Sequence, residues 1–366
     1  MASVMATHFR PYGWICRAVG LFFLQGLQSR RVHDVRATWK TWYTLYSLAC
    51  LFCFASGDLA VVLANLIRVS LRVRSFTKSM LLVLVAVMAV RVTVNVATAL
   101  FGSPGMVEFF KKSAEYEKRT AFSREHHRAR SWLSYLFRFF FLVAFFAHIV
   151  INATLSVRVF DFKGNRYLEF GVKAGVLLLN LFCFVYDVLH FVELRPCCEV
   201  LVSYIRHQGD LLRASLATRE FSGADDNRPL ECVRINLRSI IELKKVLNDV
   251  WQYSIVTSAV AILTITCFTV YSLFDGGIRP DQLAMIVTYC FYSAVDFADV
   301  ARLSQTMSNE VRRLKEYLAK MSMLHESPAR CAQLAGSVIT YSVILVQTSD
   351  SVDQRTLPRS KHTGAL

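Results

Sequence analysis

Six long apolar blocks constrain this chain more than any other feature of its sequence. Each block has the length, about 20 residues or more, that a helix needs to cross a hydrocarbon core of about 30 Å. The blocks are residues 43–67, 76–101, 133–157, 170–194, 252–274 and 282–301, and a seventh, weaker one is 331–348. Strands of a membrane barrel would be about 10 residues long and would alternate with period two, which these blocks do not. The sequence therefore predicts an all-α, polytopic membrane protein with seven transmembrane helices.

The composition agrees with this prediction. Of the 366 residues, 54% are hydrophobic and only 19% are charged, whereas an ordinary soluble domain has about 25% charged residues. The formal net charge of +15 is also typical of nucleic-acid binders, but the basic residues lie mainly between the apolar blocks, as membrane orientation requires. We therefore expect contacts with membrane lipid and none with nucleic acid.

Lysine and arginine are divided unequally between the two sets of connecting segments. The amino-terminal arm 1–42 and the segments 102–132, 195–251 and 302–330 hold 28 of the 42 basic residues, while the alternate loops and the tail 349–366 hold 11. Because basic segments stay in the cytoplasm, we expect a cytoplasmic amino terminus and an extracellular carboxyl terminus. The first external loop is basic and runs against the rule, but the total favours this orientation.

Two of the cytoplasmic segments are predicted to form amphipathic helices. Apolar residues recur at helical spacing in 195–251 and again in 302–330, and the first pattern runs directly into the span at 252. Such a stripe has to be buried, either against the other cytoplasmic helix or against a neighbouring subunit. We therefore expect these segments to anchor an assembly. In the amino-terminal arm, residues 13–27 are expected to form a further amphipathic helix at the membrane surface.

Ionisable groups inside the apolar blocks are costly and mark candidate functional positions. Arg91 and Asp187 are two of them. On the sixth block, residues at spacings of three and four share one helix face: Tyr289, Tyr292, Asp296 and Asp299. This polar face is consistent with a ligand or ion pathway. The alternative is that the two aspartates only pair with Arg302 or with another span.

The sequence does not favour catalysis. It contains no glycine-rich phosphate loop, no cluster of histidine and cysteine at metal-ligand spacing and no nucleophile motif. We therefore predict that the protein is not an enzyme and that it needs no cofactor or metal. Cys197 and Cys198, just past the fourth span, are either palmitoylated or simply reduced thiols.

The last apolar stretch, ITYSVILVQTSD, carries a motif. It contains Thr340 and Tyr341, then five mostly apolar residues, then Gln347. This pattern resembles the signature that closes insect gustatory receptors. The amino-terminal sequence FRP at 9–11 with VGLF at 19–22 is similar to the opening of that family, and the expected topology matches along nearly the whole chain.

The resemblance implies a chemosensory receptor that acts as a ligand-gated, cation-permeable channel in the plasma membrane. It implies a homo- or hetero-tetramer with related receptors, gated by a small-molecule tastant that binds between the outer halves of the helices. The last helix of each subunit would line the pore with Thr340, Tyr341, Ile344 and Gln347.

The chain departs from the family pattern at several positions. Thr348 replaces the final Phe of the motif, and Ser342 stands where the sugar-receptor branch carries Glu, which favours a bitter or other non-sugar ligand. The stretch before Thr340 is also shorter than usual. We therefore expect a shortened pore helix or linker, and a divergent or non-conducting member of the family.

Two other classes remain open at this point. A G-protein-coupled receptor would require the opposite topology, with the amino terminus outside. A secondary transporter would use the intramembrane acids, but transporters commonly show internal repeats, and no convincing repeat relates the two halves of this chain.

Overall fold

The computed structural model describes residues 3–21, 24–26, 35–37, 41–53, 56, 75–123, 132–157, 166–222, 228–275 and 280–324. Outside these residues lie the predicted last span 331–348, the tail 349–366 and much of the predicted first span 43–67. The four predicted pore residues, Thr340, Tyr341, Ile344 and Gln347, are therefore also outside. The chain divides into two compact units, Met1–Thr306 and Met307–Leu366, and the packing described below is that of the first.

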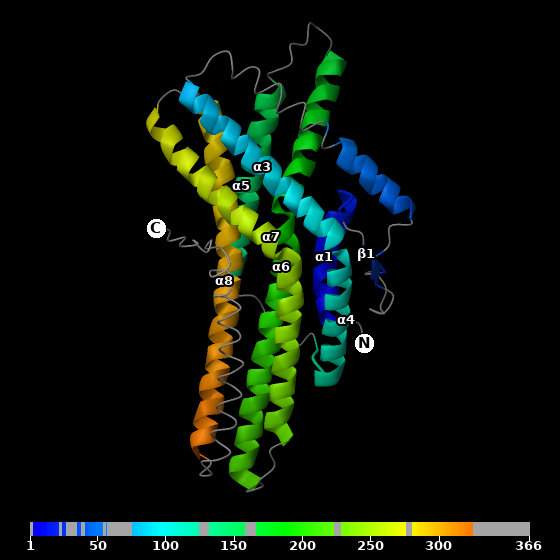
Figure 1. Cartoon of the computed structure of the whole chain (residues 1–366), viewed down its shortest axis with the longest axis vertical. Coiled ribbons are helices and arrows are strands. Elements are labelled where there is room, and N and C mark those ends of the chain that lie inside the picture. Colours follow the sequence, from blue (N-terminus) through cyan, green and yellow to red (C-terminus); the bar gives the residue numbers. More distant parts are fainter. Residues whose placement is uncertain are drawn as a thin grey trace, which may run out of the picture. The chain divides into compact units, whose positions relative to one another are not determined.

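The described residues are almost entirely helical (Figure 1). The helices are α1 Val4–Ala18, α3 Ser75–Phe101, α4 Ser103–Thr120, α5 Trp132–Val157, α6 Arg166–Ser222, α7 Arg228–Asp275 and α8 Pro280–Leu324, with a further apolar helical segment, Trp42–Cys53. Two short strands, β1 Leu24–Gln25 and β2 Arg36–Ala37, pair in antiparallel fashion. This small ladder was not anticipated by the all-α prediction.

Within the described residues, three helices contain stretches that are long and apolar enough to cross a membrane. These stretches are Leu82–Phe101, Glu231–Phe274 and Leu283–Leu314, and shorter apolar helices occupy Trp42–Cys53 and Tyr135–Ile151. Many large apolar side chains on these helices face outward; Phe140, Phe146, Val260 and Leu263 are examples. Such a surface is typical of helices in lipid. The seven-span count and the orientation stay predictions.

α6 and α7 continue well beyond the apolar blocks without a break. α6 contains the block 170–194 and runs on to Ser222, while α7 begins at Arg228, ahead of the block 252–274. The two helices pack against each other, and α7 also packs against α3 and α4. The stripe of α7 that is buried in this way contains Val233, Ile240, Leu243, Leu247 and Trp251. This apolar stripe is thus covered by helices of the same chain.

The amino-terminal helix α1 is positioned by hydrogen bonds at its first turn. A helix leaves its first backbone N–H groups without partners inside the helix. Here the Ser3 hydroxyl accepts from the Ala6 N–H at 3.3 Å, and the Glu117 carboxylate of α4 accepts from Val4 and Met5 N–H at 2.8 Å each. A carboxylate at this end also interacts favourably with the helix dipole. Glu117 therefore fixes the start of α1 on α4.

The other end of α1 is held by tyrosine hydroxyls from distant segments. Tyr43, Tyr46 and Tyr186 donate to the carbonyls of residues 17, 18 and 19 at 2.9, 2.6 and 2.7 Å. Gly20 then turns the chain with φ of +79°, where a Cβ would lie 3.0 Å from Cys50 Cβ. The helix thus spans 4–18, and the expectation of an amphipathic helix over 13–27 was wrong in its bounds, because Gly20 ends the helix.

Candidate functional site

The candidate site lies in the apolar core of the bundle. This core is a cluster of buried side chains from α3, α5, α6, α7 and α8: Leu84, Ala144, Phe145, Ile149, Phe184, Val188, Ala261, Ile265, Phe268, Ile286, Tyr289 and Tyr292. Polar groups within such a core are costly unless they are hydrogen-bonded or paired. The polar side chains that reach into it are therefore the ones whose arrangement needs an explanation.

The polar face predicted on the sixth apolar block lies on α8, and all four side chains are buried. Tyr289, Tyr292, Asp296 and Asp299 expose 3%, 0%, 5% and 1% of their surface. Their spacing of three and four residues puts them on one side of the helix, which is the side that faces the interior. Tyr289 and Tyr292 share one hydrogen-bond partner, an aspartate of α6. Asp299 instead pairs with arginines.

Asp187 of α6 is the partner of both tyrosines. Tyr289 and Tyr292 donate their hydroxyls to Asp187 Oδ2 at 3.0 and 2.9 Å, and Arg91 Nε of α3 lies 3.2 Å from Asp187 Oδ1. Arg91 Nη1 also donates to the Tyr289 hydroxyl at 3.3 Å. Opposite charges and hydroxyl donors together compensate the burial of this carboxylate. Three helices, α3, α6 and α8, thus meet at a single buried ion pair.

His148 of α5 extends this group toward the start of α8. Its Nδ1 lies 3.1 Å from the Met285 carbonyl oxygen and 3.2 Å from Thr288 Oγ1. The imidazole ring packs against Tyr289 and Tyr292, with ring centroids 5.2 and 5.4 Å apart. Sequence analysis missed His148, although an ionisable residue inside the block 133–157 was a signal that it carried.

Asp296 occupies the next turn of α8. Its carboxyl group is buried, and its Oδ2 has no hydrogen-bond partner among the described residues. An unpaired carboxylate oxygen in an apolar core is destabilising. Asp296 is therefore the member of the face that the surrounding protein satisfies least.

Asp299 forms ion pairs on both sides. Its Oδ2 lies 2.7 Å from Arg195 Nη2 of α6, and its Oδ1 lies 2.8 Å from Arg302 Nη2 one turn away on α8. The pairing alternative considered for the sequence thus describes Asp299. It does not describe Asp296, because that carboxylate has no ion-pair partner among the described residues, whereas the two oxygens of Asp299 lie 2.7 and 2.8 Å from arginine nitrogens.

Glu199 continues the ion pairs from Arg195 to two further helices. Arg195 Nε lies 3.3 Å from Glu199 Oε1, which also accepts from Arg138 Nη2 of α5 at 2.9 Å. The other carboxylate oxygen lies 3.1 Å from His8 Nε2 of α1. Side chains of α1, α5, α6 and α8 therefore join in one charged cluster.

These groups form a continuous polar column along α8, from Thr288 to Arg302. With a rise of 1.5 Å per residue, the column spans about 21 Å, most of the thickness of a hydrocarbon core. Ion pairs and hydrogen bonds that cross between helices can hold one packing arrangement and be exchanged in another. Within the described residues, no group of three or more His, Cys, Asp or Glu side chains is placed to hold a metal ion.

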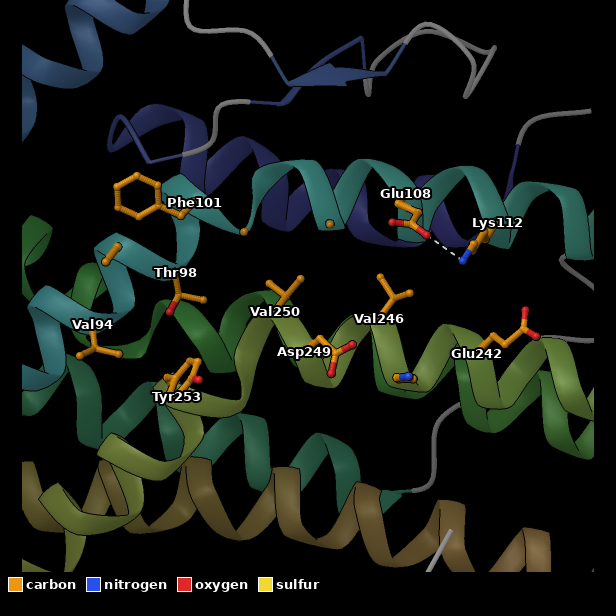
Figure 2. A pocket seen from close by; sticks show the side chains of 14 residues that line it. Val94, Thr98, Phe101, Glu108, Lys112, Glu242, Val246, Asp249, Val250 and Tyr253 are labelled. Atoms are coloured by element: carbon orange, nitrogen blue, oxygen red, sulfur yellow. Dashed lines mark ion pairs between the residues drawn. The ribbon is translucent and has the colours of Figure 1, made fainter. Parts of the chain in front are cut away.

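An open pocket of about 780 Å³ lies on another side of the bundle, between α3 and α4 on one wall and α7 on the other (Figure 2). It is lined by Val94, Ala97, Thr98, Phe101, Gly102, Gly105, Glu108, Lys112, Glu242, Lys245, Val246, Asp249, Val250 and Tyr253. Val246 and Val250 project from α7 toward α4 in Figure 2. Sequence analysis did not predict this pocket, because its walls come from segments more than a hundred residues apart.

Residues 9–334 match the family model of the 7tm chemosensory receptors. No curated protein matches the chain.

Proposed function

The chain belongs to the 7tm chemosensory receptor family, and on that premise we propose that it is a gustatory receptor of the plasma membrane, acting as a ligand-gated, cation-permeable channel. Family membership is the observation that carries the proposal. It agrees with the resemblance to insect gustatory receptors found in the sequence. It makes the protein a chemoreceptor of the membrane and points away from an enzyme.

The buried polar column supports the channel part of the proposal. Ionisable groups in membrane helices are rare, and where they occur they mark ligand sites, ion pathways or switching elements. Here they join α3, α5 and α6 to α8, the helix that leads toward the predicted pore segment 331–348. A change in the packing of α8 is thereby coupled to the ion pairs of three other helices.

Gating would then follow from a shift between two packing arrangements. A tastant that binds one arrangement more tightly increases its population. In the closed state the pair Arg91–Asp187 and the contacts of Asp299 would fix α8, and ligand binding would favour a second set of partners. Thr340, Tyr341, Ile344 and Gln347 are the residues we propose to line the pore, with Gln347 near its outer mouth.

The assembly we propose is a homo- or hetero-tetramer with a single central pore. The ligand is proposed to be a non-sugar tastant, because Ser342 stands where sugar receptors carry Glu. The orientation, with the amino terminus in the cytoplasm, follows from the excess of basic residues in alternate segments.

Expression in a cell without its own taste receptors tests the proposal. We expect a panel of bitter and other non-sugar tastants to evoke a cation current that persists when G-protein signalling is blocked. Epitope tags at each end should be detected without permeabilisation only at the carboxyl end. A response abolished by the block, together with an external amino terminus, would favour a G-protein-coupled receptor.

A further inference from the structure

The open pocket between α3–α4 and α7 has an apolar end and a charged end. Val94, Phe101 and Tyr253 belong to the apolar stretch Leu82–Phe101 and to the predicted span 252–274. The charged lining residues, at positions 108, 112, 242, 245 and 249, fall outside both ranges. Phe101 and Tyr253 expose 78% and 69% of their surface. The pocket therefore crosses the boundary where hydrocarbon gives way to polar headgroups.

The charged end combines both signs within a small space. Glu108 and Lys112 of α4 form an ion pair at 2.7 Å, drawn as a dashed line in Figure 2. Glu242 faces them from α7, and its charge contributes, after that of Glu108, to a raised pKa of Lys112. Glu242 itself pairs with Arg238 of the same helix, whose Nε lies 3.5 Å from Glu242 Oε1. In total, three carboxylates and two ammonium groups line the pocket.

Lys245 and Asp249 supply a second pair of charges, one helical turn apart on α7. Their separation of four residues corresponds to about 6 Å along the axis, and the helix spacing puts both on the face that lines the pocket. Neither side chain has an ion-pair partner in the part of the chain that the structure describes. One cation and one anion are therefore available to a ligand.

We propose that this pocket binds a phospholipid with an ethanolamine headgroup, taken from the leaflet on the side of the amino terminus. The headgroup phosphate accepts hydrogen bonds from Lys245, and the ammonium group donates to Asp249. Charge-assisted bonds of this kind are the strong ones in proteins. The acyl chains follow Phe101 and Tyr253 onto the exposed apolar face of α7, which continues through Val256, Val260 and Leu263.

The lining charges select this headgroup over others. Three carboxylates and two ammonium groups line the pocket, so a lipid with net negative charge meets an excess of like charge. A choline headgroup has no N–H to donate to Asp249. The inference rests on the proposed placement of the spans and on no property of the pore.

Lipid binding to the purified full-length protein tests this site. We would incubate the protein with equal amounts of phosphatidylethanolamine, phosphatidylcholine and phosphatidylglycerol and measure the retained lipids by native mass spectrometry. We expect phosphatidylethanolamine to be retained preferentially by the wild-type protein. In the double variant Lys245→Ala, Asp249→Asn, retention should fall about tenfold or more, because each lost charged hydrogen bond corresponds to about a factor of ten in affinity.

The matched control is Glu231→Gln, Arg234→Ala, which also removes one exposed pair of charges from α7, but outside the pocket. It should retain phosphatidylethanolamine like the wild type. Equal retention of the three lipids by the wild type, or unchanged retention by the pocket variant, would overturn the assignment. The assignment would also be overturned if the pocket variant dissociated from an oligomer to a monomer while its lipid retention stayed unchanged. That result would show that a second subunit occupies the pocket. The measurement needs no tastant and no current, so its failure is distinct from failure of the channel proposal.

Discussion

Arg91 of α3 and Asp187 of α6 face each other in the interior of the bundle, with Arg91 Nε 3.2 Å from Asp187 Oδ1 and with 0% and 1% of their side-chain surface exposed. Two hydroxyl groups, from Tyr289 and Tyr292, complete the surroundings of the carboxylate. Each charge is tolerated in the core only because the other is present. The pair is therefore expected to determine both the stability of the bundle and the position of α8.

Removing the negative charge tests this relationship. We expect Asp187→Asn to lower the free energy of unfolding by about 3 kcal/mol or more, because Arg91 would stay buried without its counter-charge. The change is measured by heating the detergent-purified protein and determining, by size-exclusion chromatography, how much folded protein is left at each temperature. Asp210→Asn, at an exposed position on α6 outside the pocket, is the control and should change stability by less than about 0.5 kcal/mol. Equal stability of the two variants would contradict the prediction.

The docking of α1 depends on Glu117, which accepts from two backbone N–H groups and, at 2.5 Å, from the Tyr204 hydroxyl. Glu117→Gln retains an acceptor oxygen but loses the charge at the helix end, so it should destabilise this region by about 1–2 kcal/mol. Hydrogen exchange at the Val4 and Met5 amides should accelerate accordingly. Glu115→Gln, exposed on the same helix, should leave their exchange unchanged. Unaltered exchange in the Glu117 variant would exclude a role of this carboxylate in holding α1.

The close approach of α4 to α7 requires a glycine at position 105. A Cβ added there would lie 2.6 Å from Val250 Cγ2, nearer than carbon atoms can pack without strain. We expect Gly105→Ala to lower stability by about 1–3 kcal/mol, as overpacking does. The double variant Gly105→Ala, Val250→Ala should recover most of that loss, since the clashing methyl group is gone. Independent, additive effects of the two changes in thermal unfolding would argue against this contact.

Cys197 and Cys198, just past the apolar block 170–194, are buried, which bears on the palmitoylation alternative. Burial raises the pKa of the Cys198 thiol from its ordinary value near 9 to about 12, and raises that of Cys197 as well. Since the thiolate is the reactive form, maleimide at neutral pH should label the exposed Cys232 and leave Cys197 and Cys198 unmodified until the protein unfolds. Labelling of Cys198 in the folded protein, detected by peptide mass spectrometry, would contradict this prediction.

The raised pKa of Cys198 also predicts the direction in which stability changes with pH. The pKa of Cys198 is higher in the folded than in the unfolded chain, so its contribution to stability is complete below pH of about 9 and is lost as the pH rises toward about 12. In Cys198→Ser the decline of stability across this window should be smaller than in the wild type. An unchanged decline would show that other groups control it.

Local patterns in the sequence predicted the helices and the shared face of Tyr289, Tyr292, Asp296 and Asp299, because helical periodicity depends only on neighbouring residues. The partners of that face were not predictable in the same way. Arg91 and Asp187 stood out as ionisable groups in apolar blocks, but their pairing depends on how distant helices pack. Glu117 lies outside the apolar blocks and gave no such signal, and the partners of both Glu117 and His148 lie on segments more than a hundred residues away.

Recording from the purified protein in a planar lipid bilayer separates a channel from a receptor that acts through G proteins, because no G protein or second messenger is present. We expect that a non-sugar tastant active on expressing cells also evokes cation-selective single-channel currents in the bilayer. The same tastant should have no effect on bilayers without protein. A protein that binds the tastant in the bilayer but never conducts, while cells respond only through a G protein, would contradict the proposed channel.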